Sequence, residues 1–177
     1  MKNIYYKTIE KYLVNHTTTK KHLNILEIGC GGKIYKQLFK EFKYSGLDLP
    51  DSKWIDNNDR PEIESKLSKV NNFENFDLIF SVATIYLLDT EDIETLIKLI
   101  SKLKKTKGKI LIFDYKKKTI DKLGSKQNDY ETILRKTFDG NFKLRNIEWC
   151  SNNILKKLVK EKLNINTSHI IEINFEK

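Results

Sequence analysis

The residues whose types and spacing could do chemistry lie close together near the start of the chain. Residues 24–33 read Asn-Ile-Leu-Glu-Ile-Gly-Cys-Gly-Gly-Lys, an apolar run that holds Glu27 and then meets three glycines. Residues 34–42 follow with apolar side chains at helical spacing. This pattern predicts a buried strand, a tight turn, and a helix whose free N–H groups face the turn. A turn of this kind can bind the polar end of a nucleotide-like ligand.

The rest of the chain must position this turn. Apolar runs predict further strands over residues 44–49, 53–57, 76–82, 109–115, 142–149 and 169–175. Helical spacing predicts helices over residues 3–15, 62–70, 89–104, 129–138 and 153–163. Strands that alternate with helices form a mainly parallel sheet covered on both faces. We therefore expect one α/β domain over residues 1–177, with its ligand at the carboxyl ends of the strands.

Composition excludes several classes of protein. The 177 residues are 39% hydrophobic and 32% charged, which is typical of a soluble globular domain. No run of about 18 apolar residues predicts a membrane span, and the first residues lack the apolar block of a secretion signal. Cys30 and Cys150 are far apart and fit no metal-ligand spacing. We therefore expect a cytoplasmic protein without a metal site.

The net charge of +9 is unevenly distributed. Residues 102–126 hold ten lysines against Asp114 and Asp121, which gives +8 in this stretch. Such a stretch can attract phosphate groups, but charge runs usually form solvated surface. Residues 102–109 end a predicted helix and begin a strand, so we expect them at the edge of the sheet away from the ligand. Only the lysines at 116–118 should emerge on the ligand side.

Three motifs together resemble the class I S-adenosylmethionine-dependent methyltransferases. They are Glu-Ile-Gly-Cys-Gly-Gly at 27–32, Gly-Leu-Asp at 46–48, and Phe-Asp-Leu-Ile-Phe-Ser at 76–81. The competing dinucleotide motif Gly-x-Gly-x-x-Gly needs a glycine at position 34, where the chain has Ile34. The chain departs from the methyltransferase motif at Lys33, the usual third-glycine position. The resemblance implies a three-layer αβα fold with a seven-stranded sheet whose last strand is antiparallel.

The resemblance also implies S-adenosylmethionine as cofactor and a set of residues that bind it. Glu27 would orient the amino group of the methionine part, and Asp48 would accept hydrogen bonds from the ribose hydroxyls. Gly29 and Gly31 would let the backbone approach the cofactor closely. The neighbouring residues Cys30 and Leu49 belong to the same site.

Two further cofactor contacts are less closely tied to a motif. Asp56 would lie by the adenine amino group, and Ser81 would line the methionine side. The alternative is that Asp56 and Ser81 are an ordinary loop residue and a small residue at a strand end.

Candidate acceptor contacts are the polar rings expected near the ligand edge of the sheet. They are Tyr6, His16, Tyr86 and Tyr115, together with Asp114 and the lysines at 116–118. His16 could act as a general base, and the tyrosines could equally be half-buried packing rings. His22 and His169 are expected to be structural.

The resemblance implies methyl transfer, which needs mainly an in-line arrangement of donor and acceptor. Ser-Val-Ala-Thr at 81–84 is not the Asn/Asp-Pro-Pro-Tyr motif of enzymes that methylate exocyclic amines. We expect a small-molecule or saccharide acceptor. The alternatives are an RNA methyltransferase and a methyltransferase-like fold that serves as a non-catalytic binding or scaffold protein. Nothing in the sequence identifies the oligomeric state.

Overall fold

The computed structural model describes residues 4–17, 22–70, 73, 75–115, 129–146 and 168–175. Its α-helices are α1 (Ile4–Thr17), α2 (Thr90–Thr106) and α4 (Tyr130–Thr137), and its short 3-10 helices are η1 (Lys36–Phe39), η2 (Leu67–Lys69) and η3 (Ile85–Leu87). Its strands are β1 (Asn24–Ile28), β2 (Lys43–Asp48), β3 (Ile63–Glu64), β4 (Leu78–Val82), β5 (Lys109–Tyr115), β6 (Phe142–Asn146) and β7 (Ser168–Asn174). Among these helices none is both long and apolar enough to cross a bilayer.

The strands form one seven-stranded sheet in the order β3-β2-β1-β4-β5-β7-β6. Neighbours from β3 to β5 pair in parallel, and β7 pairs antiparallel with both β5 and β6. This confirms the expected mainly parallel sheet with an antiparallel last strand. The chain order reverses direction between β1 and β4, where an open α/β sheet forms its ligand-binding crevice.

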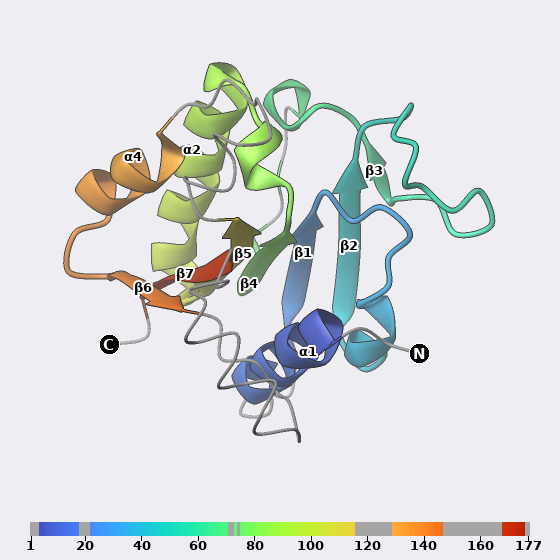
Figure 1. The fold of residues 1–177 in the computed structure, drawn as a ribbon, viewed down its shortest axis with the longest axis horizontal. Coiled ribbons are helices and arrows are strands. Elements are labelled where there is room, and N and C mark those ends of the chain that lie inside the picture. The colour runs from blue at the N-terminus through green and yellow to red at the C-terminus, as the bar shows by residue number, and fades with distance from the viewer. Residues whose placement is uncertain are drawn as a thin grey trace, which may run out of the picture.

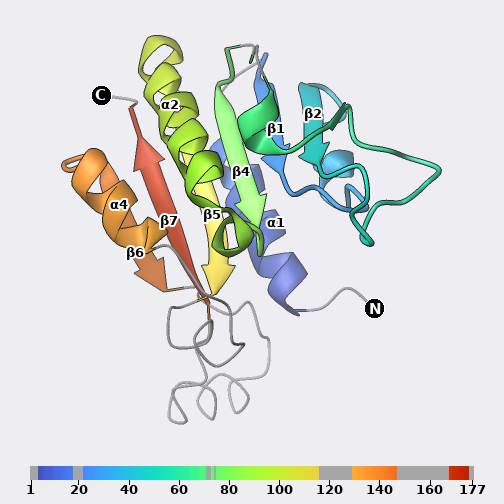
Figure 2. The same cartoon turned by 90° about the horizontal axis from the view of Figure 1, so that it is seen from above.

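Helices cover the two faces of the sheet to give three layers (Figures 1 and 2). On one face, α2 and α4 pack against a cluster that includes Leu26, Ile28 and Ile112. On the other face, α1 and η1 pack against a second cluster that includes Ile25 and Phe80. Because β1, β4 and β5 are covered on both sides, their sequences are nearly continuous apolar runs.

The helix α2 shows why the sequence signals succeed in this half of the chain. Asp89 accepts a hydrogen bond from the N–H of Asp92 at 3.0 Å and so caps the first turn. Ile93, Leu96 and Ile100 are buried at helical spacing. Asp129 caps α4 in the same way. The expected helices 89–104 and 129–138 are therefore confirmed.

The prediction of a helix over residues 34–42 is wrong. After the glycine turn the chain makes successive turns and only one short 3-10 helix, η1. Ile34, expected on the buried face, is 55% exposed, whereas Tyr35 and Phe39 are buried. A few buried rings satisfy an apolar pattern without a regular helix, because periodicity over so short a run does not fix the backbone.

Residues 53–70 also differ from expectation. The strand predicted over 53–57 is a loop with Trp54 72% exposed, and the third strand is instead β3. The helix predicted over 62–70 is replaced by β3 and η2. The cause is tertiary, because the Glu62 carboxylate accepts hydrogen bonds from Gly46 N–H and Lys33 Nζ instead of facing solvent on a helix. The helix expected over 153–163 and residues 147–149 lie outside the described residues.

Candidate functional site

The glycine turn follows the carboxyl end of β1 and lies against the carboxyl end of β2. Gly29 and Gly31 have φ angles of 71° and 49°, a region that glycine adopts far more easily than other residues. The N–H groups of Gly29 and Cys30 both donate to the Leu47 carbonyl oxygen, at 2.8 and 3.2 Å. The turn is therefore anchored at the carboxyl edge of the sheet, next to the end of β2.

Asp48 ends β2 and faces this turn. Its Oδ2 accepts a 2.7 Å hydrogen bond from Gly31 N–H, and its Oδ1 accepts a 2.8 Å hydrogen bond from Leu49 N–H. The two backbone donors fix the plane of a half-buried carboxylate. Each carboxylate oxygen can accept more than one hydrogen bond, so both can still accept from a ligand hydroxyl.

The side chains of Thr84 and Trp54 pack against the turn. A Cβ on Gly29 would lie 2.1 Å from Thr84 Oγ1, and a Cβ on Gly31 would lie 3.2 Å from Trp54 Cβ. Thr84 follows β4 and Trp54 belongs to the loop after β2, so the turn is wedged between two neighbouring segments. Glycine is required here for this close packing as well as for its backbone angles.

Glu27 lies in β1 directly below the turn and is 2% exposed. Burial raises the pKa of its carboxyl group to about 8, although a hydrogen bond from Tyr44 opposes this rise. Tyr44 OH donates to Glu27 Oε2 at 2.5 Å. The negative charges of Asp48 and Glu62 raise the Glu27 pKa further, and the positive charge of Lys33 lowers it. Glu27 and Asp48 therefore share one electrostatic environment.

Cys30 packs inside this environment. Its side chain is buried, and a Cβ on Gly46 would lie 2.7 Å from its Sγ. Burial raises the pKa of the thiol, and the nearby negative charges of Glu27 and Asp48 add to the rise. Because the thiolate is the reactive form, Cys30 is a packing residue rather than a nucleophile.

The ion pairs of Lys33 were not foreseen from the sequence. Its side chain is 1% exposed, and its Nζ lies 2.6 Å from Asp59 Oδ1, 2.9 Å from Glu62 Oε1 and 2.5 Å from the Arg60 carbonyl oxygen. Burial lowers the pKa of the Lys33 amine, but the hydrogen bonds to Asp59 and Glu62 outweigh burial and raise it. The available signal was a lysine at the third-glycine position, followed by a carboxylate-rich segment.

The remaining predicted cofactor contacts occupy different surroundings. Ser81 is 1% exposed, and its hydroxyl donates to the Ile28 carbonyl oxygen at 2.9 Å. Leu49 is 47% exposed beside Asp48. Asp56 lies in the exposed loop and accepts a 2.9 Å hydrogen bond from Asn58 N–H. The structure thus brings Glu27 and residues 29–31 to Asp48, whereas Asp56 remains engaged in its own turn.

Tyr86 and Tyr115 meet at the carboxyl ends of β4 and β5. Their ring centroids are 5.5 Å apart in an edge-to-face arrangement. Both backbones are held by Asp114, whose carboxylate accepts Tyr86 N–H at 3.0 Å and Tyr115 N–H at 2.8 Å. Burial raises the pKa of Asp114 to about 7, although these hydrogen bonds and one from Tyr130 oppose the rise. These two predicted acceptor contacts therefore form one aromatic pair.

The other two predicted acceptor contacts lie apart from this pair. Tyr6 is a buried residue of α1, and its hydroxyl donates to the Ile34 carbonyl oxygen at 3.1 Å. His16 lies in the last turn of α1, 3.3 Å from the Nζ of Lys109 at the start of β5. The start of β5 is the opposite end of the sheet from the glycine turn, so the structure does not bring His16 to the candidate site. The lysines at 116–118 are outside the described residues.

Comparison with known proteins supports the fold assignment. No protein-family model matches the sequence. No curated protein sequence matches it significantly. Solved structures do match: a SAM-dependent methyltransferase from Archaeoglobus fulgidus aligns with a TM-score of 0.67 at 14% identity, covering 97% of this chain and 94% of that one.

Two further matches are also methyltransferases. The plantazolicin methyltransferase BamL, in complex with a desmethylplantazolicin analogue and S-adenosylhomocysteine, gives a TM-score of 0.61 at 16% identity over 98% of this chain and 85% of that one. The N-methyltransferase NodS from Bradyrhizobium japonicum gives 0.60 at 15% identity over 97% of each chain. The fold is therefore the Rossmann-like fold of S-adenosylmethionine-dependent methyltransferases, as the sequence motifs predict.

Proposed function

We propose that this protein is a methyltransferase that uses S-adenosylmethionine to methylate a small-molecule or saccharide acceptor. The observation that carries the proposal is the Asp48 carboxylate, held by Gly31 N–H at the carboxyl edge of β2. This edge lies at the reversal of strand order, where ligands bind in open α/β sheets.

The donor chemistry of the site fits the cofactor. Asp48 has acceptor capacity for the two ribose hydroxyls, and the buried Glu27 carboxyl would accept from the ammonium group of the methionine part. Leu49 is exposed beside Asp48 and offers an apolar surface to the adenine ring. Asp56 and the backbone at Ser81 complete the proposed contacts. The cofactor supplies a methyl group on a positively charged sulfur, and the chain's part is to hold donor and acceptor in line.

The aromatic pair Tyr86–Tyr115 is the proposed wall of the acceptor site. Both rings are half-buried at the carboxyl ends of β4 and β5, and Asp114 fixes their backbones. Rigid rings of this kind suit an organic acceptor that lies flat against them. BamL, a methyltransferase with a similar fold, binds an organic molecule together with S-adenosylhomocysteine, which supports this proposal. The unpaired, buried thiol of Cys30 fits a reducing compartment, and we place the protein in the cytoplasm.

Calorimetric titration with S-adenosylhomocysteine tests the proposal directly. We expect saturable binding of one ligand per chain, together with transfer of labelled methyl groups from S-adenosylmethionine to small molecules in a cell extract. Absence of both binding heat and thermal stabilisation at millimolar ligand would establish the scaffold alternative instead. Label recovered in RNA, with an affinity for RNA that falls steeply with salt, would establish the RNA alternative.

A further inference from the structure

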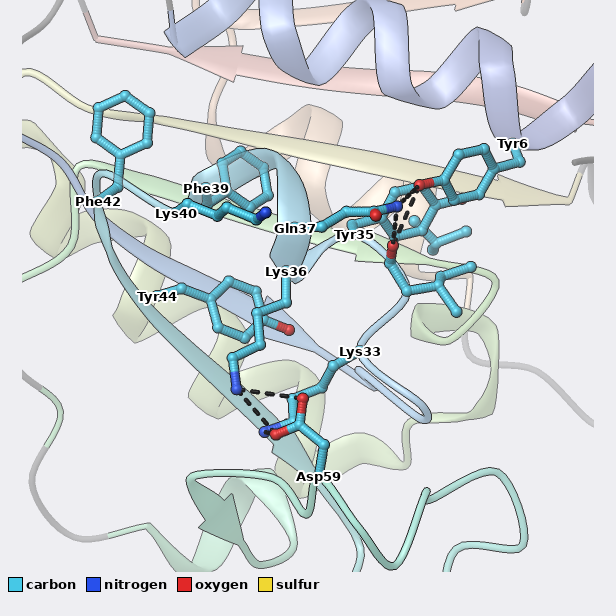
Figure 3. Close-up of a pocket in the computed structure, with 12 residues that line it drawn as sticks. Tyr6, Lys33, Tyr35, Lys36, Gln37, Phe39, Lys40, Phe42, Tyr44 and Asp59 are labelled. Carbon is cyan, nitrogen blue, oxygen red and sulfur yellow. Dashed lines mark hydrogen bonds and ion pairs between the residues drawn. The ribbon is translucent and has the colours of Figure 1, made fainter.

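A cavity of about 1000 Å³ lies beside η1, on the face of the sheet that α1 covers (Figure 3). Five aromatic rings line it, from Tyr6, Tyr35, Phe39, Phe42 and Tyr44. We call it the aromatic cavity. Neither Asp48 nor the glycines of the turn are among its lining residues. Its volume is that of a pocket for an organic molecule of drug size.

Most of the residues that line the cavity come from 33–42, where the chain makes turns and a short 3-10 helix. Its walls are nevertheless ordered by packing. Tyr6 stacks on Tyr35 with ring centroids 5.0 Å apart, and Phe39 stacks on Tyr44 at 6.1 Å. Tyr6, Tyr35 and Phe39 are all buried. A ligand would therefore meet a preformed apolar wall, which limits the ordering needed on binding.

The charges along the cavity are balanced at one end and unbalanced at the other. Lys33 and Lys36 are neutralised together by Asp59 and Glu62, with Nζ–Oδ1 distances to Asp59 of 2.6 and 2.8 Å, and Figure 3 shows the side chains of Lys33, Lys36 and Asp59 meeting. Lys40 also lines the cavity and is exposed. Within the described part of the chain, no carboxylate pairs with the Lys40 ammonium. Among the described residues that line it, the cavity therefore presents aromatic walls and the positive charge of Lys40, which no described carboxylate pairs with.

We propose that the aromatic cavity binds a flat organic molecule that carries one acidic group, with the acid at Lys40 and the ring system against Phe42 and Tyr44. The acidic group would satisfy the unpaired ammonium, and the rings would stack in the geometry that aromatic pairs prefer. Because Asp48 and the glycines of the turn do not line the cavity, the proposal does not depend on the proposed function. Tyr44 connects the two regions, because it lines the cavity and its hydroxyl donates to Glu27.

Binding of 8-anilino-1-naphthalenesulfonate, an aromatic sulfonate, tests this proposal by fluorescence and calorimetry on the full chain. We expect one probe per chain. Lys40→Gln should weaken its affinity about two- to fivefold, as for loss of one exposed ion pair. The matched variant Lys98→Gln, an exposed lysine on α2, should leave the affinity unchanged. Equal affinities for the wild type and Lys40→Gln would overturn the role of Lys40.

A second pair of variants tests the aromatic wall. Phe42→Ala should weaken probe binding about tenfold, whereas Phe73→Ala, which removes a partly buried ring from the opposite face, should not. Melting temperatures measured alongside identify any variant that binds dye because it is unfolded. If Phe42→Ala melts too low to compare, Phe42→Leu, which keeps apolar volume but no ring, should still weaken binding. Unchanged affinity in a folded Phe42 variant would overturn the proposal.

Competition separates this site from the methyl-donor site. Saturating S-adenosylhomocysteine should leave the probe affinity within about twofold of its value without ligand. Competitive displacement would show that the cavity is part of the cofactor site and would overturn the assignment of a second ligand. If S-adenosylhomocysteine itself fails to bind, the proposed function fails while the probe and variant results still decide this proposal.

Discussion

Tyr44 OH donates a 2.5 Å hydrogen bond to the buried carboxyl group of Glu27, which lies opposite Gly46 in the register of β1 and β2. Burial outweighs this hydrogen bond and raises the pKa of Glu27 from 4.5 to about 8. Between about pH 4.5 and 8, the carboxyl group of Glu27 therefore keeps in the folded protein a proton that it releases in the unfolded chain. The pair therefore connects the geometry of the site to the stability of the fold.

The first prediction concerns the dependence of stability on pH. The contribution of Glu27 is fully present below about pH 4.5 and is lost as pH rises through about 8. Glu27→Gln keeps an oxygen that accepts from Tyr44 but cannot ionise. Relative to the wild type, this variant should gain about 2 to 4 kcal/mol in free energy of unfolding between pH 5 and pH 8.5.

Urea unfolding of both proteins at several pH values measures this difference. Asp114 has a pKa raised to about 7 and lowers stability over an overlapping pH range, but it is present in both proteins. The difference between the two curves therefore isolates Glu27. Curves that run parallel from pH 5 to pH 8.5 would show that Glu27 does not hold a proton in the folded state.

The second prediction concerns the carboxylate at the end of β2. Asp48→Ala removes the proposed partner of the ribose hydroxyls and the acceptor for Gly31 N–H. It should weaken S-adenosylhomocysteine binding by on the order of 1.5–3 kcal/mol, the range for hydrogen bonds to a charged group. Calorimetry measures the loss. Asp51→Ala, which removes an exposed carboxylate three residues later, is the control and should bind as the wild type does. Unchanged affinity in Asp48→Ala would remove Asp48 from the site.

The third prediction separates two reasons for glycine in the turn. Gly29→Ala combines a φ of 71° with a clash against Thr84, whereas Gly140→Ala has a φ of 79° and no atom within 4 Å. Gly140→Ala should cost about 1 kcal/mol of stability for its backbone angle alone. Gly29→Ala should cost about 3 kcal/mol or more. Denaturant unfolding compares them, and similar losses would show that Thr84 does not press on the turn.

The fourth prediction concerns the buried amine of Lys33. Lys33→Met leaves Glu62 and Asp59 with fewer partners and removes a cation that is 1% exposed, whereas Lys36 shares these carboxylates but is 41% exposed. The carboxylates of Asp59 and Glu62 are 47% and 36% exposed, so water can solvate them after either substitution. Lys33→Met also removes the hydrogen bonds of a buried amine, each worth about 1 kcal/mol, whereas the exposed ion pairs of Lys36 are worth about 1 kcal/mol or less. Lys33→Met should therefore destabilise the fold much more than Lys36→Met. Thermal unfolding decides between them, and the reverse order would contradict the observed burial.

The sequence predicted those strands of the sheet that consist of a single uninterrupted apolar run. Local patterns predict the buried strands β1, β4 and β5, because a strand covered on both faces is a continuous apolar run. They also predict helix α2, because a capping residue precedes its apolar spacing. The motifs around Glu27 and Asp48 predicted that these residues would lie close together, since their parallel strands β1 and β2 end at the same edge of the sheet.

Residues 33–42 and 53–70 could not be predicted in the same way. Lys33, Glu62 and Gly46 are far apart in the sequence, and their contacts fix the backbone of a segment whose own pattern favoured a strand and a helix. The same holds for the aromatic cavity, whose rings come from α1, from β2, and from η1 and the turns beside it. Local pattern determined which elements form the sheet of this protein. Long-range pairing of buried charges and rings decided the path of the chain around its site, because the free energy of such pairs depends on neighbours that only the folded state brings together.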